Sequence, residues 1–199
     1  MVDGKRPHGG SRPDSSARPD PIDEFEASSI DDSAVQKLEE NGLIPSQSLI
    51  GWRTAPGEDF PMPSEEEIVV YQKFFTAGLG LPTSDFFRGL LHYYGLELVH
   101  LNPNSILHIS VFVHLCEAFL GIPPHFALFV HLFQLKPQPS SNKLKVVGGA
   151  GLQLRNKNEY IIVPFKDSLK RWREGWFYCE NHAPSLPAFT GRLLKQNPN

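Results

Sequence analysis

The most apolar stretch of the chain, residues 106–135, constrains the fold more than any other feature. Residues 121–124, Gly-Ile-Pro-Pro, interrupt it, so each half falls short of the about 20 residues that a helix needs to cross a bilayer. The half before the break predicts a helix over residues 105–120, capped by Asn102 and apolar nearly all round, which is typical of a central buried element. We therefore expect helices buried in a soluble core and no membrane span.

Cysteine usage and composition indicate how such a chain is held together. The sequence has 199 residues, 40% of them hydrophobic, and its two cysteines are Cys116 and Cys179. A disulfide framework is excluded, so folding depends on an apolar core of a size suited to one domain. The first twelve residues contain no apolar run after Lys5 and Arg6, which excludes a secretory signal. We expect an intracellular protein.

Charge is distributed unevenly along the sequence. Residues 1–67 carry 6 Lys and Arg against 15 Asp and Glu, residues 68–135 carry 2 against 3, and residues 136–199 carry 11 against 4. The formal net charge of −3 therefore hides an acidic start and a basic end. The basic end is compatible with anion binding or with the acidic arm folding back over it, but composition favours an ordinary solvated surface at both ends.

Capping residues and periodicity predict the elements. The fold class is α+β: a mainly helical core of about five helices, followed by a small antiparallel sheet and preceded by a disordered, acidic N-terminal arm. We assign residues 1–31 to the arm, 32–187 to one domain and 188–199 to a tail. Besides the helix over 105–120, helices are expected from Ser33 to Gly42, from Ser64 to Gly78, from Ser84 to Gly95 and over 125–135. Short strands are expected over 143–147, 152–155, 159–163 and 176–179.

No motif in the sequence predicts a catalytic centre, a bound metal or a cofactor. The glycines at 148–151 lack the Lys-Ser/Thr of a phosphate-binding loop, and Cys179 with His182 provides only half the ligands of a zinc site. Three carboxylates could in principle hold two metal ions, but none stands in the pattern of a strand-transfer enzyme. The carboxylates beyond residue 67 are Asp85, Glu97, Glu117, Glu159, Asp167, Glu174 and Glu180.

The segment 166–178 is the candidate binding site. It alternates cations with aromatic rings, which can bind single-stranded nucleic acid through phosphate contacts and base stacking. In the alternative interpretation the tryptophans fill the core while their cationic neighbours are solvated. The candidate nucleic-acid-binding residues are Lys166, Lys170, Arg171, Trp172, Arg173 and Trp176.

The order of several segments resembles the gypsy-type transposon domain of plants, a family labelled as a transposase. The resemblance extends over about residues 33–187 and is carried by Phe-x-x-Gly-Leu-Gly-Leu-Pro at 75–82, Leu-Cys-Glu-Ala-Phe-Leu-Gly-Ile at 115–122, Pro-His-Phe-Ala-Leu-Phe at 124–129 and Trp-x-x-x-Trp-Phe-Tyr at 172–178. It implies an origin in a plant retroelement-like sequence and residence in the nucleus or cytoplasm, and it assigns no catalytic residue.

These observations lead to three functional hypotheses. The first is a non-catalytic module of transposon origin that associates weakly with single- or double-stranded nucleic acid or takes part in assembly, with self-association as an open alternative. The second is a metal-dependent nuclease or strand-transfer enzyme. The third is a purely protein-binding domain whose tryptophans pack inside.

Overall fold

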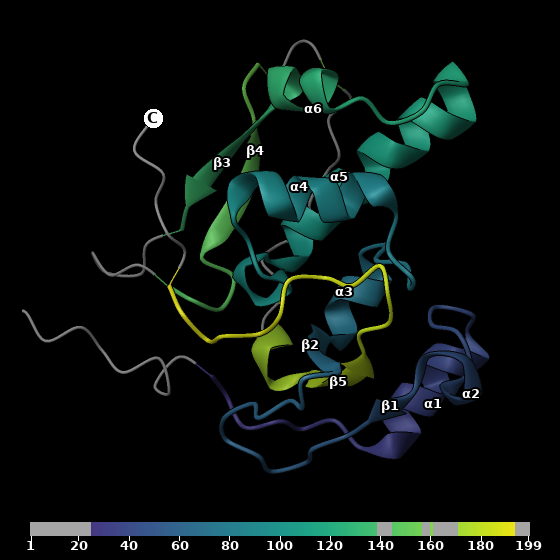
Figure 1. Cartoon of the computed structure of the whole chain (residues 1–199), viewed down its shortest axis with the longest axis vertical. Helices are drawn as coiled ribbons and strands as arrows, with labels where there is room; N and C mark the ends of the chain where they lie inside the picture. Colours follow the sequence, from purple (N-terminus) through teal and green to yellow (C-terminus); the bar gives the residue numbers. More distant parts are fainter. Residues whose placement is uncertain (1–24, 139–144, 157–159, 161–170, 194–199) are drawn as a thin grey trace, which may run out of the picture.

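The computed structural model describes residues 25–138, 145–156, 160 and 171–193, and these form a mixed α+β fold (Figure 1). In the view of Figure 1 a three-stranded sheet lies at one end, a two-stranded hairpin lies at the other, and helices fill the space between them. The fold class predicted from the sequence is confirmed. The helices are α1 (Asp32–Glu40), α2 (Gln47–Ile50), α3 (Gln72–Thr76), α4 (Asp85–Tyr94), α5 (Pro103–His114) and α6 (Phe126–Leu132), with short helical segments η2 (Leu98–His100), η3 (Leu115–Leu120) and η4 (Trp172–Glu174).

The three-stranded sheet joins the two ends of the described chain. It has the order β1–β5–β2 and is antiparallel, with β1 (Trp52–Arg53) and β2 (Glu67–Tyr71) on either side of β5 (Trp176–Glu180). Cys179 is opposite Trp52 on one side and Ile68 on the other. The strand expected over residues 176–179 is therefore confirmed, and it is the central strand of the sheet.

The helix expected from Ser64 to Gly78 is wrong over its first half. The Ser64 N–H donates to Glu67 at 2.8 Å, so the local capping contact forms, but a strand follows it. Residues 68–71 are all buried, because the sheet packs on both of its faces. Such burial favours β-branched residues in a strand over a helix with one apolar face. The helical part that remains, α3, begins only at Gln72.

Helices α4 and α5 confirm the predictions made from their caps. The Ser84 hydroxyl accepts from the Phe87 N–H at 3.2 Å, and α4 ends at Gly95, whose φ of 62° is left-handed. The side-chain amide oxygen of Asn102 accepts from the Ser105 N–H at 2.8 Å, with Pro103 in the first turn. At α1, by contrast, the N-cap is Asp31 instead of Ser33.

Helix α5 continues into η3, a π-helical turn. By length and composition alone the combined stretch Pro103–Leu120 could cross a membrane, with a mean hydropathy of 1.2. Only 39% of the stretch is buried inside the protein, mainly along the face of α5 that carries Ile106, Ile109 and Phe112, so it is less enclosed than the buried central element expected from the sequence. The exposed end of the stretch carries Phe119, whose side chain is 74% exposed.

The hairpin at the other end is formed by β3 (Phe133–Pro137) and β4 (Ala150–Leu154). The helix expected over 125–135 stops at Leu132, because Phe133 enters the core as the first residue of a strand. The strand expected over 152–155 is confirmed as β4, whereas residues 145–147 are not a strand. The strand expected over 159–163 lies outside the described residues, apart from Tyr160.

Residues 25–31, which the sequence analysis assigned to the disordered arm, pack against the protein instead. Phe25 and Ile30 are buried, and the Ser28 hydroxyl donates to the Trp176 carbonyl at 2.6 Å. Scattered apolar residues in a polar segment are enough for ordering when each of them meets a preformed surface. Phe189, assigned to the tail, also packs here, with its ring 5.8 Å from that of Phe25. Residues 1–24 lie outside the described part of the chain.

Candidate functional site

The two tryptophans of the predicted binding segment have different surroundings. Trp176 is 0% exposed, and its indole N–H donates to the Glu26 carbonyl at 2.8 Å. Trp172 is half-buried, with its ring edge-on to Tyr71 at 4.8 Å between centroids. A methyl group at Gly148 would lie 2.8 Å from the Trp172 ring, so glycine permits the close approach. Trp176 thus belongs to the core, and Trp172 lies at its margin.

The two described cations of the segment also differ. The Arg171 side chain is 84% exposed and faces Glu174 at 3.6 Å. Arg171 itself has a φ of 58°, in the left-handed region. Arg173 is half-buried, donates to the Val147 carbonyl at 3.2 Å and lies with its guanidinium carbon 5.6 Å from the centre of the Trp172 ring. Lys166 and Lys170 lie outside the described residues.

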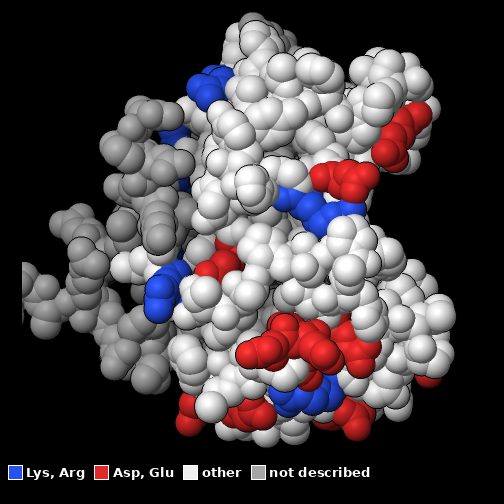
Figure 2. All heavy atoms as spheres, in the orientation of Figure 1, with Lys and Arg blue, Asp and Glu red and all other residues white. Residues whose placement is uncertain are grey.

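Acidic residues gather on the surface over the three-stranded sheet. Figure 2 shows Asp and Glu side chains around a few Lys and Arg at the bottom of the view, over the three-stranded sheet. There Arg53 makes a two-pronged ion pair with Glu67, at 2.6 and 2.8 Å, and lies 3.8 Å from the centre of the Tyr178 ring. The hydrogen bond from Arg53 is the main cause that lowers the pKa of Glu67, with a further contribution from the Ser64 N–H.

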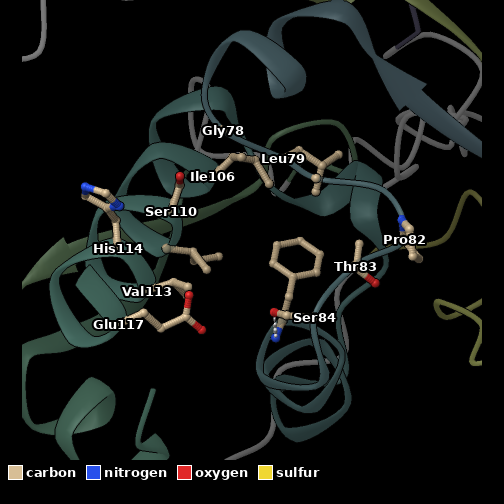
Figure 3. Close-up of a pocket in the computed structure, with 13 residues that line it drawn as sticks. Gly78, Leu79, Pro82, Thr83, Ser84, Ile106, Ser110, Val113, His114 and Glu117 are labelled. Atoms are coloured by element: carbon tan, nitrogen blue, oxygen red, sulfur yellow. Dashed lines mark hydrogen bonds between the residues drawn. The ribbon is translucent and has the colours of Figure 1, made fainter. Parts of the chain in front are cut away.

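A cleft of about 340 Å³ is the second candidate site, and the sequence analysis did not find it (Figure 3). It lies between the turn that follows α3, the start of α4 and one face of α5 with the first turn of η3. Its apolar wall includes Phe87, Ile109 and Val113, and its polar groups include Ser110 and Glu117.

A close contact between the turn and the helix forms one side of the cleft. Gly78 has a φ of 95°, and a methyl group built on it would overlap the Ser110 side chain. Only a residue without a side chain lets the backbone turn there and approach α5 so closely. The first glycine of the Gly-Leu-Gly-Leu-Pro turn is therefore required by the structure.

Ser110, His114 and Glu117 follow one another at i, i+4 and i+7, so they share one face of the helix. In Figure 3 the Glu117 carboxylate turns into the cleft, whereas the His114 ring points away from it. That ring packs edge-on against Phe119, 5.6 Å between centroids. Among the described residues no hydrogen bond joins the three side chains.

The cleft lies within the segment of the chain that matches a known family model. Residues 68–137 match the family model described as "Putative gypsy type transposon". This gypsy-type transposon-related segment runs from β2 to β3 and contains every residue that lines the cleft. It confirms the resemblance seen in the sequence over that range and ends before the cationic segment 166–178. Neither the curated proteins nor the solved structures give a match.

We expect Gly78→Ala, at the edge of the cleft in the transposon-related segment, to lower the free energy of unfolding by about 1–2 kcal/mol, because of its left-handed backbone and the overlap with Ser110. Gly80→Ala in the same turn is the matched control, since a methyl group there meets no atom within 4 Å. Its effect is expected to stay within about 0.5 kcal/mol. Urea unfolding of the two variants measures the difference, and equal values would contradict the described contact.

Metal-binding side chains are scattered in the described part of the chain, where no group of three or more His, Cys, Asp or Glu could hold an ion. His182 pairs with Glu180 at 2.8 Å and is exposed, whereas Cys179 is buried in β5. Burial raises the pKa of the Cys179 thiol, which keeps it protonated and a poor metal ligand. Within the transposon-related segment Asp85 pairs with Arg88, three residues further along α4.

Proposed function

We propose that this chain is a transposon-related binding module that associates with nucleic acid through phosphate contacts and catalyses no reaction. The transposon-related segment supports the first part of the proposal. The observation that supports nucleic-acid association is the position of Arg171, whose side chain is 84% exposed beside Trp172 and Arg173. It lies in the region of the sequence with 11 cations against 4 carboxylates.

The contacts of these side chains define what each can contribute. Arg171 faces Glu174 at 3.6 Å in an exposed pair, and such pairs contribute about 1 kcal/mol or less, so a phosphate can replace the carboxylate. Trp172 offers a partly exposed ring for stacking. We no longer include Trp176 among the proposed nucleic-acid-binding residues, because its ring is buried and cannot stack on a base. Lys166 and Lys170 remain candidates on the sequence alone.

A titration at several salt concentrations tests the proposal. Labelled single-stranded RNA and DNA are titrated with the protein, and fluorescence anisotropy gives the affinity. Loss of one phosphate contact in Arg171→Gln is expected to reduce the slope of log affinity against log salt by about 0.7. Lys37→Gln, an exposed charge on the acidic helix α1, is the control and should leave the slope unchanged. Lys166→Gln/Lys170→Gln measures the contribution of those two lysines.

Two results would refute the proposal. If the wild-type protein does not bind at low salt, nucleic-acid association is refuted. If it cleaves labelled DNA in the presence of Mg²⁺ or Mn²⁺, the non-catalytic role is refuted and the nuclease hypothesis returns.

The exposed apolar side chains of Phe119, Leu120 and Ile122, at the end of α5 and η3, support a second function, assembly or protein binding. Sedimentation of the protein without nucleic acid measures self-association directly. A monomer at every concentration tested would refute self-association, and only binding to a different protein would remain for this surface.

A further inference from the structure

We propose that the cleft between α4 and α5 binds a protonated amine carried on an apolar stem. This inference concerns a site apart from Arg171 and does not depend on nucleic-acid binding. The cleft volume, about 340 Å³, is at the lower end of the range for small-molecule sites. Its walls are mixed: Phe87 of α4 and Ile109 and Val113 of α5 contribute apolar surface, and Ser110 of α5 and Glu117 of η3 contribute polar groups.

The charge of the cleft selects the sign of the ligand. All the residues that line it are described, and among them Glu117 is the one carboxylate, with no Lys or Arg. The Glu117 carboxylate makes no hydrogen bond or ion pair within the described residues, and it turns into the cleft (Figure 3). An anionic ligand would meet this carboxylate without a cation to offset it, whereas an ammonium group would pair with it.

The guanidinium of Arg88, which is bonded to a residue that lines the cleft, does not change this conclusion. Arg88 follows the start of α4, and its side chain donates to the Thr83 carbonyl and to Asp85. Its charge is therefore already engaged at the margin of the cleft. The N-terminus of α4 is likewise occupied, because the Ser84 hydroxyl accepts from the Phe87 N–H.

The spacing along the helix defines the shape of the ligand. Ser110 and Glu117 are seven residues apart, which is about 10 Å along a helix axis, with Val113 between them. An ammonium group at Glu117 would place its stem back along Val113 and Ile109. The Ser110 hydroxyl makes no hydrogen bond within the described residues and lies at the far end of that path. A free arylalkylamine and a lysine side chain of a peptide share this chemistry.

The test uses the full chain, labelled with ¹⁵N, and three probes. Benzylamine presents the cation on an apolar stem, benzyl alcohol is its neutral counterpart, and N-acetyl-lysine methylamide presents the same head group from a peptide. Benzylamine is expected to shift the amide signals of Gly78, Gly80 and Ser110 at lower concentration than benzyl alcohol does. Binding of the lysine derivative in preference to benzylamine would identify a peptide as the source, and the reverse would identify a free amine.

Glu117→Gln decides the role of the carboxylate. It is expected to weaken benzylamine binding by roughly threefold to fivefold, as for one partly exposed ion pair, and to leave benzyl alcohol binding unchanged. Glu65→Gln, which changes an exposed carboxylate outside the cleft, is the matched control and should bind like the wild type. Equal binding of amine and alcohol, unchanged amine binding in Glu117→Gln, or shifts located away from the cleft would each overturn the proposal.

Discussion

Replacing Trp176 with alanine is expected to lower the free energy of unfolding by about 3–5 kcal/mol. The side chain is 0% exposed at the start of the central strand β5 and packs edge-on against Tyr178, 5.5 Å between ring centroids. Removing the indole leaves a cavity in the core beside the end of the sheet. It also leaves the Glu26 carbonyl without the donor that now reaches it at 2.8 Å. That second loss acts on residues 25–31, which β5 holds against the core.

Urea unfolding followed by circular dichroism measures this effect, with Trp172→Ala as the matched control. Trp172 is half-buried at the margin of the core, so its truncation is expected to lower the free energy of unfolding by only about 1–2 kcal/mol. Trp176→Phe separates packing from hydrogen bonding, because it keeps a ring and removes the N–H. Equal losses for the two alanine variants would show that Trp176 is not the core residue described.

The contrast between these tryptophans illustrates what the sequence could not predict. Both stand among cations in the segment 166–178, so composition favoured core packing over stacking on nucleic acid but did not distinguish the two tryptophans. The difference arises because β5 is inserted between β1 and β2, which come from the first half of the chain. Pairing between strands more than 100 residues apart leaves no local signal in either partner.

The same difference between local and long-range contacts separates the helix predictions that were correct from the one that was wrong. At α4 the cap, the periodicity and the terminating glycine act within a few residues, and at α5 the cap does, so local reasoning succeeded. At Ser64 the cap contact with Glu67 also forms, yet the following residues join the sheet, because burial on both faces outweighs one local hydrogen bond.

The cleft was missed for a related reason. The spacing of Ser110, His114 and Glu117 on one helix face is visible in the sequence, and the expected helix contained all three. The cleft forms because the turn at Gly78 lies against this helix face and contacts Ser110. Gly78 is 32 positions earlier in the sequence. A helix face alone does not define a pocket without the element that lies opposite it.

Acid is expected to destabilise the protein through His108, a buried residue of α5. Its ring lies in the core, 5.3 Å from the centre of the Phe133 ring, and burial lowers its pKa from the ordinary 6.5 to about 4. Between these two pH values the unfolded chain binds a proton on this imidazole and the folded chain does not. The stabilisation from a neutral His108 is therefore complete above pH 6.5 and is lost as the pH falls toward 4, by about 3 kcal/mol in total.

Urea unfolding at a series of pH values measures this loss in the wild type and in His108→Gln, which cannot take up the proton. The variant is expected to be less stable at neutral pH, because it loses the buried ring that packs on Phe133, but to lose less stability between pH 6.5 and 4. His92→Gln, on the exposed face of α4, is the control and should follow the wild type. If His108→Gln has the same pH dependence as the wild type, the acid sensitivity arises from other groups and the burial of a neutral imidazole does not control it.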